Sequence, residues 1–286
     1  MICDSGRNEY PRADLAGEMG DIATKRIEGG RRLREGARPI SPLVSIISVV
    51  FRAREELPPL MESVFAACGQ DTEIIVIDGG AQDGTVELLR GWDDKIDYWL
   101  SEPDRGIYDA MNKGLAAASG EYILHLNAGD RLRLMPRDIL RKCLAEQIEV
   151  ACFAVKMAGW GIFRPRTGLL LHIDNTWHHQ GTFYRRRIHP GYDLKYRVFA
   201  DFDCNQKLLK ARKSAAMFDE VVAEQVSVGA SGHGAVRDEL YRIIRANFGT
   251  VFVFLAVVWA VFAGPRLWLK HLLNRFDSDL GARNGR

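Results

Sequence analysis

The sequence lacks features that several common protein classes require. Its five cysteines are an odd number without CxxC spacing, which excludes a disulfide scaffold and a cysteine-rich zinc module and favours a reducing compartment. The formal net charge of the 286-residue chain is only +2, so nucleic acid is not an expected partner. The N-terminal residues lack the apolar core of a secretory signal peptide. With 47% hydrophobic and 27% charged residues, the chain can nevertheless bury a globular core.

Two common nucleotide-binding motifs are also missing. The turn after the first strand-like segment reads RAREE and has no glycine, so the GxGxxG fingerprint of dinucleotide binding is absent. Gly79 and Gly84 have the spacing of a phosphate-binding P-loop, but Thr85 stands where that loop needs its lysine. A bound nucleotide must therefore be held in another way.

The two ends of the chain differ from its body. Residues 1–43 are polar, rich in glycine and arginine and without a sustained period, so we expect a disordered arm, with contact to anionic lipid as an alternative. Residues 226–286 are expected to form a helical, membrane-associating tail around the uncharged segment 248–264. As a helix this segment is about 25 Å long, at the short limit for crossing a hydrocarbon core of about 30 Å. A buried core helix is the alternative.

Between these ends, strand and helix patterns alternate. Continuous apolar runs predict strands at 44–51, 73–77, 98–100 and 122–126, and helical spacing predicts helices at 55–67, 86–90 and 107–119. Such alternation predicts an α/β domain over residues 44–225, with a mostly parallel sheet and right-handed crossovers.

Polar residues follow three of the predicted strands. Arg52 follows the first strand, Asp78 the second, and Asn127 with Asp130 the fourth. Ligands of open α/β sheets bind at the carboxyl ends of the strands, so these residues predict a binding site there. Two acids fit a carboxylate that reads a nucleoside and another that holds a divalent metal on its diphosphate. The alternative interpretation for Asp78 and Asp130 is that each is only a loop residue without a ligand. Asp83 is expected to cap a helix.

Five blocks of sequence together carry a family resemblance. They read VSIISVVFR, IDGGAQDGT, SEPDRGIYDAMNKGLAAASGEYILHLNAGD, HHQGTFYRR and YRVFADFDCNQKLL, in this order between about residues 44 and 209. They resemble family 2 glycosyltransferases, particularly bacterial enzymes of colanic-acid-type exopolysaccharide and lipopolysaccharide assembly. The resemblance implies an α/β fold of the GT-A type, here followed by a C-terminal apolar helix. It also implies a nucleotide-sugar half over residues 44–130 and an acceptor half over residues 131–225.

The resemblance implies roles for individual residues as well. Asp201 matches the catalytic base, and Asp203 would support it or meet the acceptor. Asp130 matches the acid that binds Mg²⁺ or Mn²⁺ on the diphosphate, although its region reads NAGD and keeps one carboxylate where many relatives have two or three. The remaining matches are residues expected to contact the donor or the acceptor. Ser48 and Phe51 would line the pocket of the nucleotide base, Asp78 would contact uracil or ribose, and His179 with Gln180 would lie near the acceptor and the diphosphate.

Several residues allow two interpretations. Arg105 either contacts a phosphate or faces solvent, and Asn112 either reaches a ligand or forms a local hydrogen bond. Asn127 belongs to the NAGD segment expected to bind the metal. Arg52 stands where relatives often have Asn, and either neutralises diphosphate or faces solvent. We expect Asp201 and Asp203 to share one face of an extended segment. The remaining expectations concern aromatic and histidine residues: no structural zinc on His178 and His179, and core positions rather than sugar platforms for Trp160, Trp177 and Phe183.

The function implied is inverting, metal-dependent transfer of a hexose from a nucleoside-diphosphate sugar, with UDP as the expected nucleotide. The acceptor is expected to be a hydroxyl of a glycan or lipid-linked oligosaccharide in cell-surface polysaccharide synthesis. The apolar tail would place the enzyme at the cytoplasmic face of the inner membrane, peripherally or with one span. Two alternatives remain: a nucleotidyltransferase on a related α/β core, and an inactive sugar-nucleotide-binding scaffold of a polysaccharide assembly complex.

Overall fold

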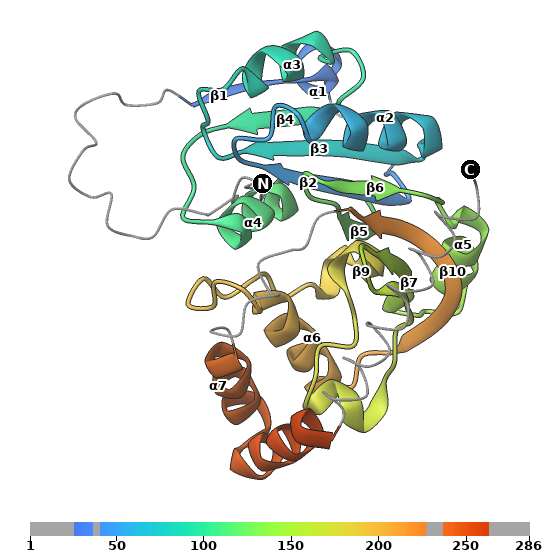
Figure 1. Cartoon of the computed structure of the whole chain (residues 1–286). Helices are drawn as coiled ribbons and strands as arrows, with labels where there is room; N and C mark the ends of the chain where they lie inside the picture. Colours follow the sequence, from blue (N-terminus) through green and yellow to red (C-terminus); the bar gives the residue numbers. More distant parts are fainter. Residues whose placement is uncertain (1–25, 37–40, 227–236, 263–286) are drawn as a thin grey trace, which may run out of the picture.

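The computed structural model describes residues 26–36, 41–226 and 237–262. Within these residues ten strands form a single sheet, in the order β1-β4-β3-β2-β5-β9-β7-β10-β6, with β8 paired to β7 (Figure 1). Helices pack on both faces of this sheet, as Figure 1 shows for α2 and α4. The predicted α/β architecture is therefore confirmed.

The first half of the domain is a parallel sheet with helical crossovers. Its strands are β2 (Val44–Val50), β3 (Thr72–Asp78), β4 (Tyr98–Ser101) and β5 (Tyr122–His125), all parallel to their neighbours. The helices between them are α2 (Leu57–Ala67), α3 (Thr85–Gly91) and α4 (Ile107–Ala117). These elements match the predicted ranges closely, because each carries its own clear hydrophobic period.

The second half extends the sheet with mixed pairing. Its strands are β6 (Asp130–Leu132), β7 (Val150–Met157), β8 (Gly161–Phe163), β9 (Thr182–Arg185) and β10 (Ala215–Gln225). Strand β9 runs antiparallel between β5 and β7, so it joins the two halves. The helical elements are α5 (Arg137–Ala145), η2 (Gly168–His172), η3 (His179–Gly181), η4 (Arg186–Ile188), α6 (Ala200–Lys210) and α7 (Arg237–Phe248).

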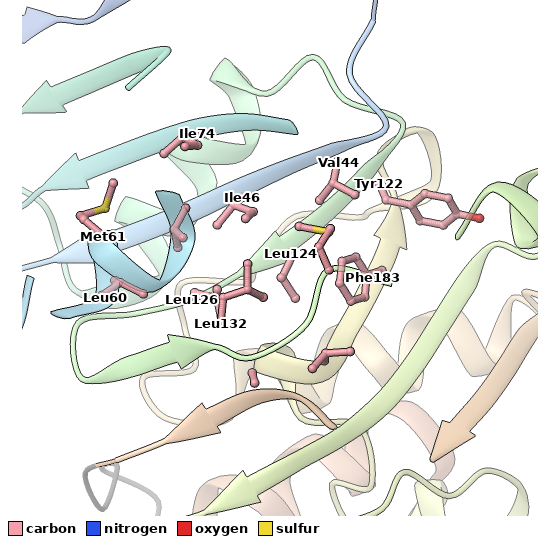
Figure 2. Close-up of a cluster of buried hydrophobic side chains, with 14 of the residues drawn as sticks. Val44, Ile46, Leu60, Met61, Ile74, Tyr122, Leu124, Leu126, Leu132 and Phe183 are labelled. Atoms are coloured by element: carbon pink, nitrogen blue, oxygen red, sulfur yellow. The ribbon is translucent and has the colours of Figure 1, made fainter. Parts of the chain in front are cut away.

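Two hydrophobic cores lie on opposite faces of the sheet. Because side chains alternate along a strand, Ile46 of β2 points to one core and Ile47 to the other. Figure 2 shows Ile46 in the first core together with Leu60 and Met61 of α2. Met111 of α4 belongs to the second core. The two cores hold the central strands from both faces, and the carboxyl ends of these strands are thereby kept in fixed positions relative to one another.

Part of the predicted N-terminal arm belongs to the sheet. Strand β1 (Ile27–Gly29) pairs antiparallel with β4 and forms one edge of the sheet, and helix α1 (Arg31–Glu35) follows it. Arg32 pairs with Glu73 of β3, whose side chain is almost wholly buried. Glu73 also accepts hydrogen bonds from the hydroxyls of Ser45 and Ser119. Residues 26–36 are therefore ordered against the domain, whereas the rest of the predicted arm lies largely outside the described residues.

We expect Arg32→Ala to destabilise the domain by about 1–3 kcal/mol, because it leaves the buried Glu73 carboxylate without its cation. The two serine hydroxyls keep part of the carboxylate satisfied and limit the loss. Chemical denaturation measures the change in the free energy of unfolding. Arg34→Ala is the matched control, since half of the Arg34 side chain is exposed. Equal stability of the two variants would contradict the role given to the Arg32–Glu73 pair.

The apolar segment near the C-terminus is helical where it is described. After Gly249, which has a φ of +89°, a helix covers residues 250–262. One face packs on the domain, where the Phe252 ring stacks on His172 with centroids 5.0 Å apart. The other face exposes Val251, Phe254, Val261 and Phe262. None of the helices in the described ranges combines the length and hydropathy needed to cross a bilayer.

Candidate active site

Asp78 lies where β3 ends, beside the neighbouring strand ends. Its carboxylate accepts a hydrogen bond from the Ser101 hydroxyl at 2.6 Å and one from the Gly80 backbone N–H at 3.2 Å, both at Oδ2. The other oxygen, Oδ1, is buried and has no hydrogen-bond partner within the described residues. Burial raises the pKa of Asp78 to about 6, against the opposing effect of these hydrogen bonds. Asp78 thus keeps one buried acceptor oxygen without a partner among the described residues, beside the strand ends.

The backbone beside Asp78 is closely surrounded. A Cβ on Gly79 would lie 2.6 Å from Asp104 Oδ2 and 2.9 Å from Phe51 Cδ2, so a larger residue there would force these two side chains to shift. The Phe51 ring therefore lies against Gly79, the residue that follows Asp78. Ser48 lies deeper in β2, where its hydroxyl is buried and lacks a partner among the described residues.

Asp130 lies at the end of the NAGD turn and begins β6. Its Oδ2 accepts a hydrogen bond from the Asn127 backbone N–H at 2.8 Å. Burial raises its pKa to about 6, while the nearby His179 and a hydrogen bond with Gln180 oppose the rise. Two further buried oxygens, Asn127 Oδ1 and Gln180 Oε1, have no partner in the described part of the chain. The NAGD turn and η3 thus each contribute a buried, unpartnered amide oxygen in the neighbourhood of Asp130.

His179 lies between this turn and Asp201. The Asn127 side-chain amide nitrogen lies 3.2 Å from His179 Nε2, and His179 Nδ1 lies 3.5 Å from Asp201 Oδ2. Residues 179–181 form the short helix η3 directly ahead of β9, the strand next to β5. The fold of β9 thus brings the HHQ block to the carboxyl end of β5. These contacts bring Asn127, His179 and Asp201 together.

Asp201 is held by neighbours on several elements. The Phe202 backbone N–H donates to its Oδ1 at 2.9 Å, and the Tyr108 hydroxyl lies 3.1 Å from the same oxygen. The Asn175 amide donates to Oδ2 at 3.0 Å. Burial favours a raised pKa, but the hydrogen bonds and positive potential of His179, together with Asn175, outweigh it and lower the pKa of Asp201. The side chain is therefore a buried, ionised carboxylate with a fixed orientation.

The expectation that Asp201 and Asp203 share one face is wrong. Both lie in the first turn of α6, not in an extended segment, and residues two apart on a helix point in different directions. Asp203 pairs with Lys207 at 2.6 Å and accepts a hydrogen bond from the Asn247 amide at 3.0 Å. These contacts direct Asp203 toward α7 and leave Asp201 alone beside His179.

Other candidates have local partners. Arg105 pairs with Asp109 at 2.9 Å while most of its side chain stays in solvent. Asn112 donates to the Tyr192 carbonyl and accepts from the Tyr192 N–H, each at 2.8 Å, which favours local bonding over ligand contact. Arg52 has a φ of +50°, and its guanidinium lies 5.4 Å from the Phe51 ring centre.

The aromatic candidates divide into two groups. Trp177 and Phe183 are buried core residues, as expected. Trp160 is 52% exposed and lies in the turn between β7 and β8, so its predicted core position is wrong. His178 packs edge-on against Phe163 with ring centroids 4.4 Å apart. No group of three His, Cys, Asp or Glu side chains that could hold a metal occurs within residues 26–36, 41–226 and 237–262.

Three contributors to the site were not singled out from the sequence. Ser101 and Asp104 border the Asp78 region, and Asn175 donates to Asp201 from an irregular loop. Ser101 and Asp104 follow a predicted strand, so their place at a strand end is a usable signal. No local pattern marks Asn175, because its contact with Asp201 joins segments 26 residues apart.

Comparison with known proteins identifies a family for this chain. The profile of "Glycosyl transferase family 2" matches residues 45–199. A Mycobacterium tuberculosis protein described as an uncharacterized glycosyltransferase is 44% identical over 92 residues, which cover 32% of this chain and only 35% of that protein. A "PGL/p-HBAD biosynthesis glycosyltransferase" of Mycobacterium bovis is 32% identical over 181 residues, covering 58% of this chain and 69% of the relative.

Solved structures share the fold at low sequence identity. S. aureus TarS 1-349 in complex with UDP-GlcNAc aligns with a TM-score of 0.54 and 14% identity, covering 71% of this chain and 64% of that one. The mannosyltransferase PcManGT from Pyrobaculum calidifontis, in complex with GDP-Man and Mn²⁺, aligns with a TM-score of 0.53 and 17% identity, over 85% and 76% of the two chains. These likenesses support the GT-A fold. The chain belongs to glycosyl transferase family 2.

Proposed function

We propose that this protein transfers a hexose from a nucleoside-diphosphate sugar, with UDP as the nucleotide, to a hydroxyl of a glycan or lipid-linked acceptor. The observation that carries the proposal is the chain of contacts from Asn127 through His179 to Asp201, beside the buried Asp130. This chain lies at the strand ends where Asp78 offers an unpartnered oxygen. A nucleotide-sugar lying across these ends meets an acid near its nucleoside, another near its diphosphate and a third near the reacting sugar.

The donor would lie with its nucleoside at Asp78 and Phe51 and its diphosphate at the NAGD turn. Asp130 and Asn127 suit a hard cation such as Mg²⁺ or Mn²⁺, because both present oxygen ligands. One carboxylate is sufficient where phosphate oxygens complete the coordination. When bound, such an ion neutralises the charge that develops on the departing diphosphate. The mannosyltransferase complex with GDP-Man and Mn²⁺ is consistent with this donor chemistry.

Asp201 is proposed as the base of an inverting single displacement. It takes the proton of the acceptor hydroxyl as the acceptor oxygen bonds to the anomeric carbon. The bond from that carbon to the diphosphate oxygen breaks on the opposite face, and the nucleoside diphosphate leaves with the electron pair. The lowered pKa of Asp201 keeps the carboxylate ionised at neutral pH and ready to accept the proton.

The two alternative functions make different predictions for one assay. A nucleotidyltransferase releases pyrophosphate, and an inactive scaffold binds a sugar nucleotide without consuming it. Sugar transfer releases a nucleoside diphosphate. We therefore propose to incubate the protein with UDP-, GDP- and dTDP-sugars in turn, with Mn²⁺ or with a chelator, and to measure the nucleoside diphosphate. Metal-dependent release from one donor is expected, whereas binding without release from any donor would favour the scaffold.

We propose that the enzyme works at the cytoplasmic face of the cell membrane in polysaccharide synthesis, bound peripherally through residues 250–262. This helix exposes Val251, Phe254, Val261 and Phe262, which is a high density of large apolar side chains for a surface in water. Trp259, partly exposed on the same helix, suits the headgroup region. An acceptor carried on a lipid would reach the enzyme at the same surface.

We expect the wild-type protein to sediment with vesicles of phosphatidylcholine and phosphatidylglycerol. Phe254→Ser with Phe262→Ser should weaken the partition coefficient by more than about tenfold, because burial of each phenylalanine is worth about 1.5–3 kcal/mol. Ile162→Ser is the control, since Ile162 is an exposed apolar residue of β8. Equal sedimentation of the double variant and the control variant would contradict membrane binding through this helix.

A further inference from the structure

The loop that precedes α6 has a charged partner on α7. The carboxylate of Glu239 accepts hydrogen bonds from three consecutive backbone amides, those of Arg197 at 2.9 Å, Val198 at 2.8 Å and Phe199 at 2.7 Å. Glu239 is 8% exposed, and the Arg242 guanidinium lies 3.9 Å away with most of its side chain in solvent. Both oxygens of the Glu239 carboxylate are therefore hydrogen-bonded to this loop.

The same loop controls where Asp201 lies. Phe199 is the N-cap residue directly before α6, and Asp201 follows in the first turn of the helix. The Tyr108 hydroxyl lies 2.7 Å from the Val198 carbonyl oxygen and 3.1 Å from Asp201 Oδ1, so one side chain contacts both the loop and the carboxylate. A shift of residues 197–199 therefore moves the start of α6 and the Tyr108 contact together.

We propose that Glu239 is a positioning residue for Asp201. It acts from α7 as a charged cap on the segment that begins α6, where an anion is favoured by the free amides and by the helix dipole. Without that charge, as in Glu239→Gln, one of the two acceptor oxygens is replaced by an amide NH₂ group. The three backbone amides then share a single uncharged acceptor, and the first turn of α6 loosens. This proposal rests on the role of Asp201 in the proposed function. If Glu239 positions Asp201, then α7, the helix that directly precedes residues 250–262, helps to hold the catalytic base in place.

The first test needs no substrate. Glu239→Gln should speed the exchange of amide hydrogens in residues 197–202 while exchange in β2, β3 and α4 stays unchanged. Asp238→Asn is the matched control, because it removes an exposed acid from the neighbouring position of α7. Binding of UDP with Mn²⁺, measured by calorimetry, should be unchanged in both variants, since Asp78 and Asp130 are not displaced. Unchanged exchange at residues 197–202 would overturn the proposal.

The second test separates positioning from general stability. Displacement of a catalytic group by about 1 Å can cost about 10²-fold in rate, so Glu239→Gln should lower kcat for nucleoside diphosphate release by about 10–100-fold with little change in donor KM. In an Asp201→Asn background the same substitution should have almost no further effect, because it acts through the lost group. An equal loss in both backgrounds would show that Glu239 serves the structure in general.

The outcomes also separate this proposal from the proposed function. If Asp201→Asn turns over like the wild-type protein, the base assignment fails whatever Glu239 does. If Asp201→Asn is inactive but Glu239→Gln turns over normally, only the role of Glu239 fails. Glu239→Asp covers the case in which the glutamine variant does not fold. It keeps the charge but shortens the reach, and it should change exchange and kcat in the same direction by less.

Discussion

Asp201→Asn should lower the turnover number for sugar transfer by about 10²–10⁴-fold, the contribution typical of a positioned general base. The asparagine cannot take the acceptor proton, yet it fills the same space beside His179 and Asn175. Donor binding should persist, because Asp78 and Asp130 lie on other elements. Rates of nucleoside diphosphate release and calorimetric titration with UDP and Mn²⁺ measure the two properties separately.

Asp203→Asn is the control for this experiment. It replaces a buried acid two residues away on the same helix, but its partners are Lys207 and Asn247 rather than His179. We expect a loss of stability with turnover largely retained in the folded protein. Turnover by Asp201→Asn at the wild-type rate, or a similar loss in both variants, would contradict the assignment of the base.

The second large effect is expected at the metal region. Asp130→Asn should reduce the Mn²⁺-dependent gain in affinity for a UDP-sugar by about 10–100-fold or more, since loss even of an outer-shell partner of a metal costs that much. No second carboxylate compensates, because the rest of the NAGD turn supplies only amide and backbone oxygens. Calorimetric titrations with and without a chelator give the metal-dependent part directly. Asp138→Asn, at a fully exposed position, is the control.

This metal-dependent affinity should also respond to pH. The pKa of Asp130 is raised to about 6, so lowering the pH from 8 to 5 protonates the carboxylate and removes a cation ligand. The gain in affinity from Mn²⁺ should therefore fall through this range in the wild-type protein and stay small throughout in Asp130→Asn. Asp78 titrates in the same range, but it affects donor binding with and without the metal. A gain independent of pH would contradict a ligand role for Asp130.

Much of the first half of the fold is predictable from the sequence, because its elements are defined locally. The runs at β2 and β3 are buried along their whole length and contain mainly β-branched residues, which marks central parallel strands. The polar residues that follow them then fall at one edge of the sheet by topology alone. This reasoning places Asp78, Asn127 and Asp130 correctly relative to the strands.

Other parts of the structure depend on contacts that no local pattern records. Residues 26–36 contain a strand of three residues and a helix of five, too short to show a hydrophobic period. They are ordered because Arg32 reaches the buried Glu73, 41 positions further along the chain. Such a pair is invisible in a polar, arginine-rich stretch. The same reason explains why the sequence alone did not point to Glu239.

The helix that carries Asp201 was mistaken for an extended segment for a physical reason. Its first turn, ADFD, alternates small or aromatic residues with acids, which has the period of a strand. The capping of this turn comes from Glu239 on α7, not from a neighbouring residue. The resemblance to the family therefore located Asp201, while the structure was needed to separate it from Asp203.

The most direct test of the account is the chemical fate of a donor sugar. A UDP-sugar with an α-linked hexose is incubated with the protein and Mn²⁺, and the anomeric proton signals are followed by nuclear magnetic resonance from the first minutes. With water or a glycan as acceptor, the account predicts loss of the donor signal and first appearance of the β-configured product together with UDP. Across the UDP-, GDP- and dTDP-sugars, a donor signal that persists, or a product formed first with the configuration of its donor, would contradict it.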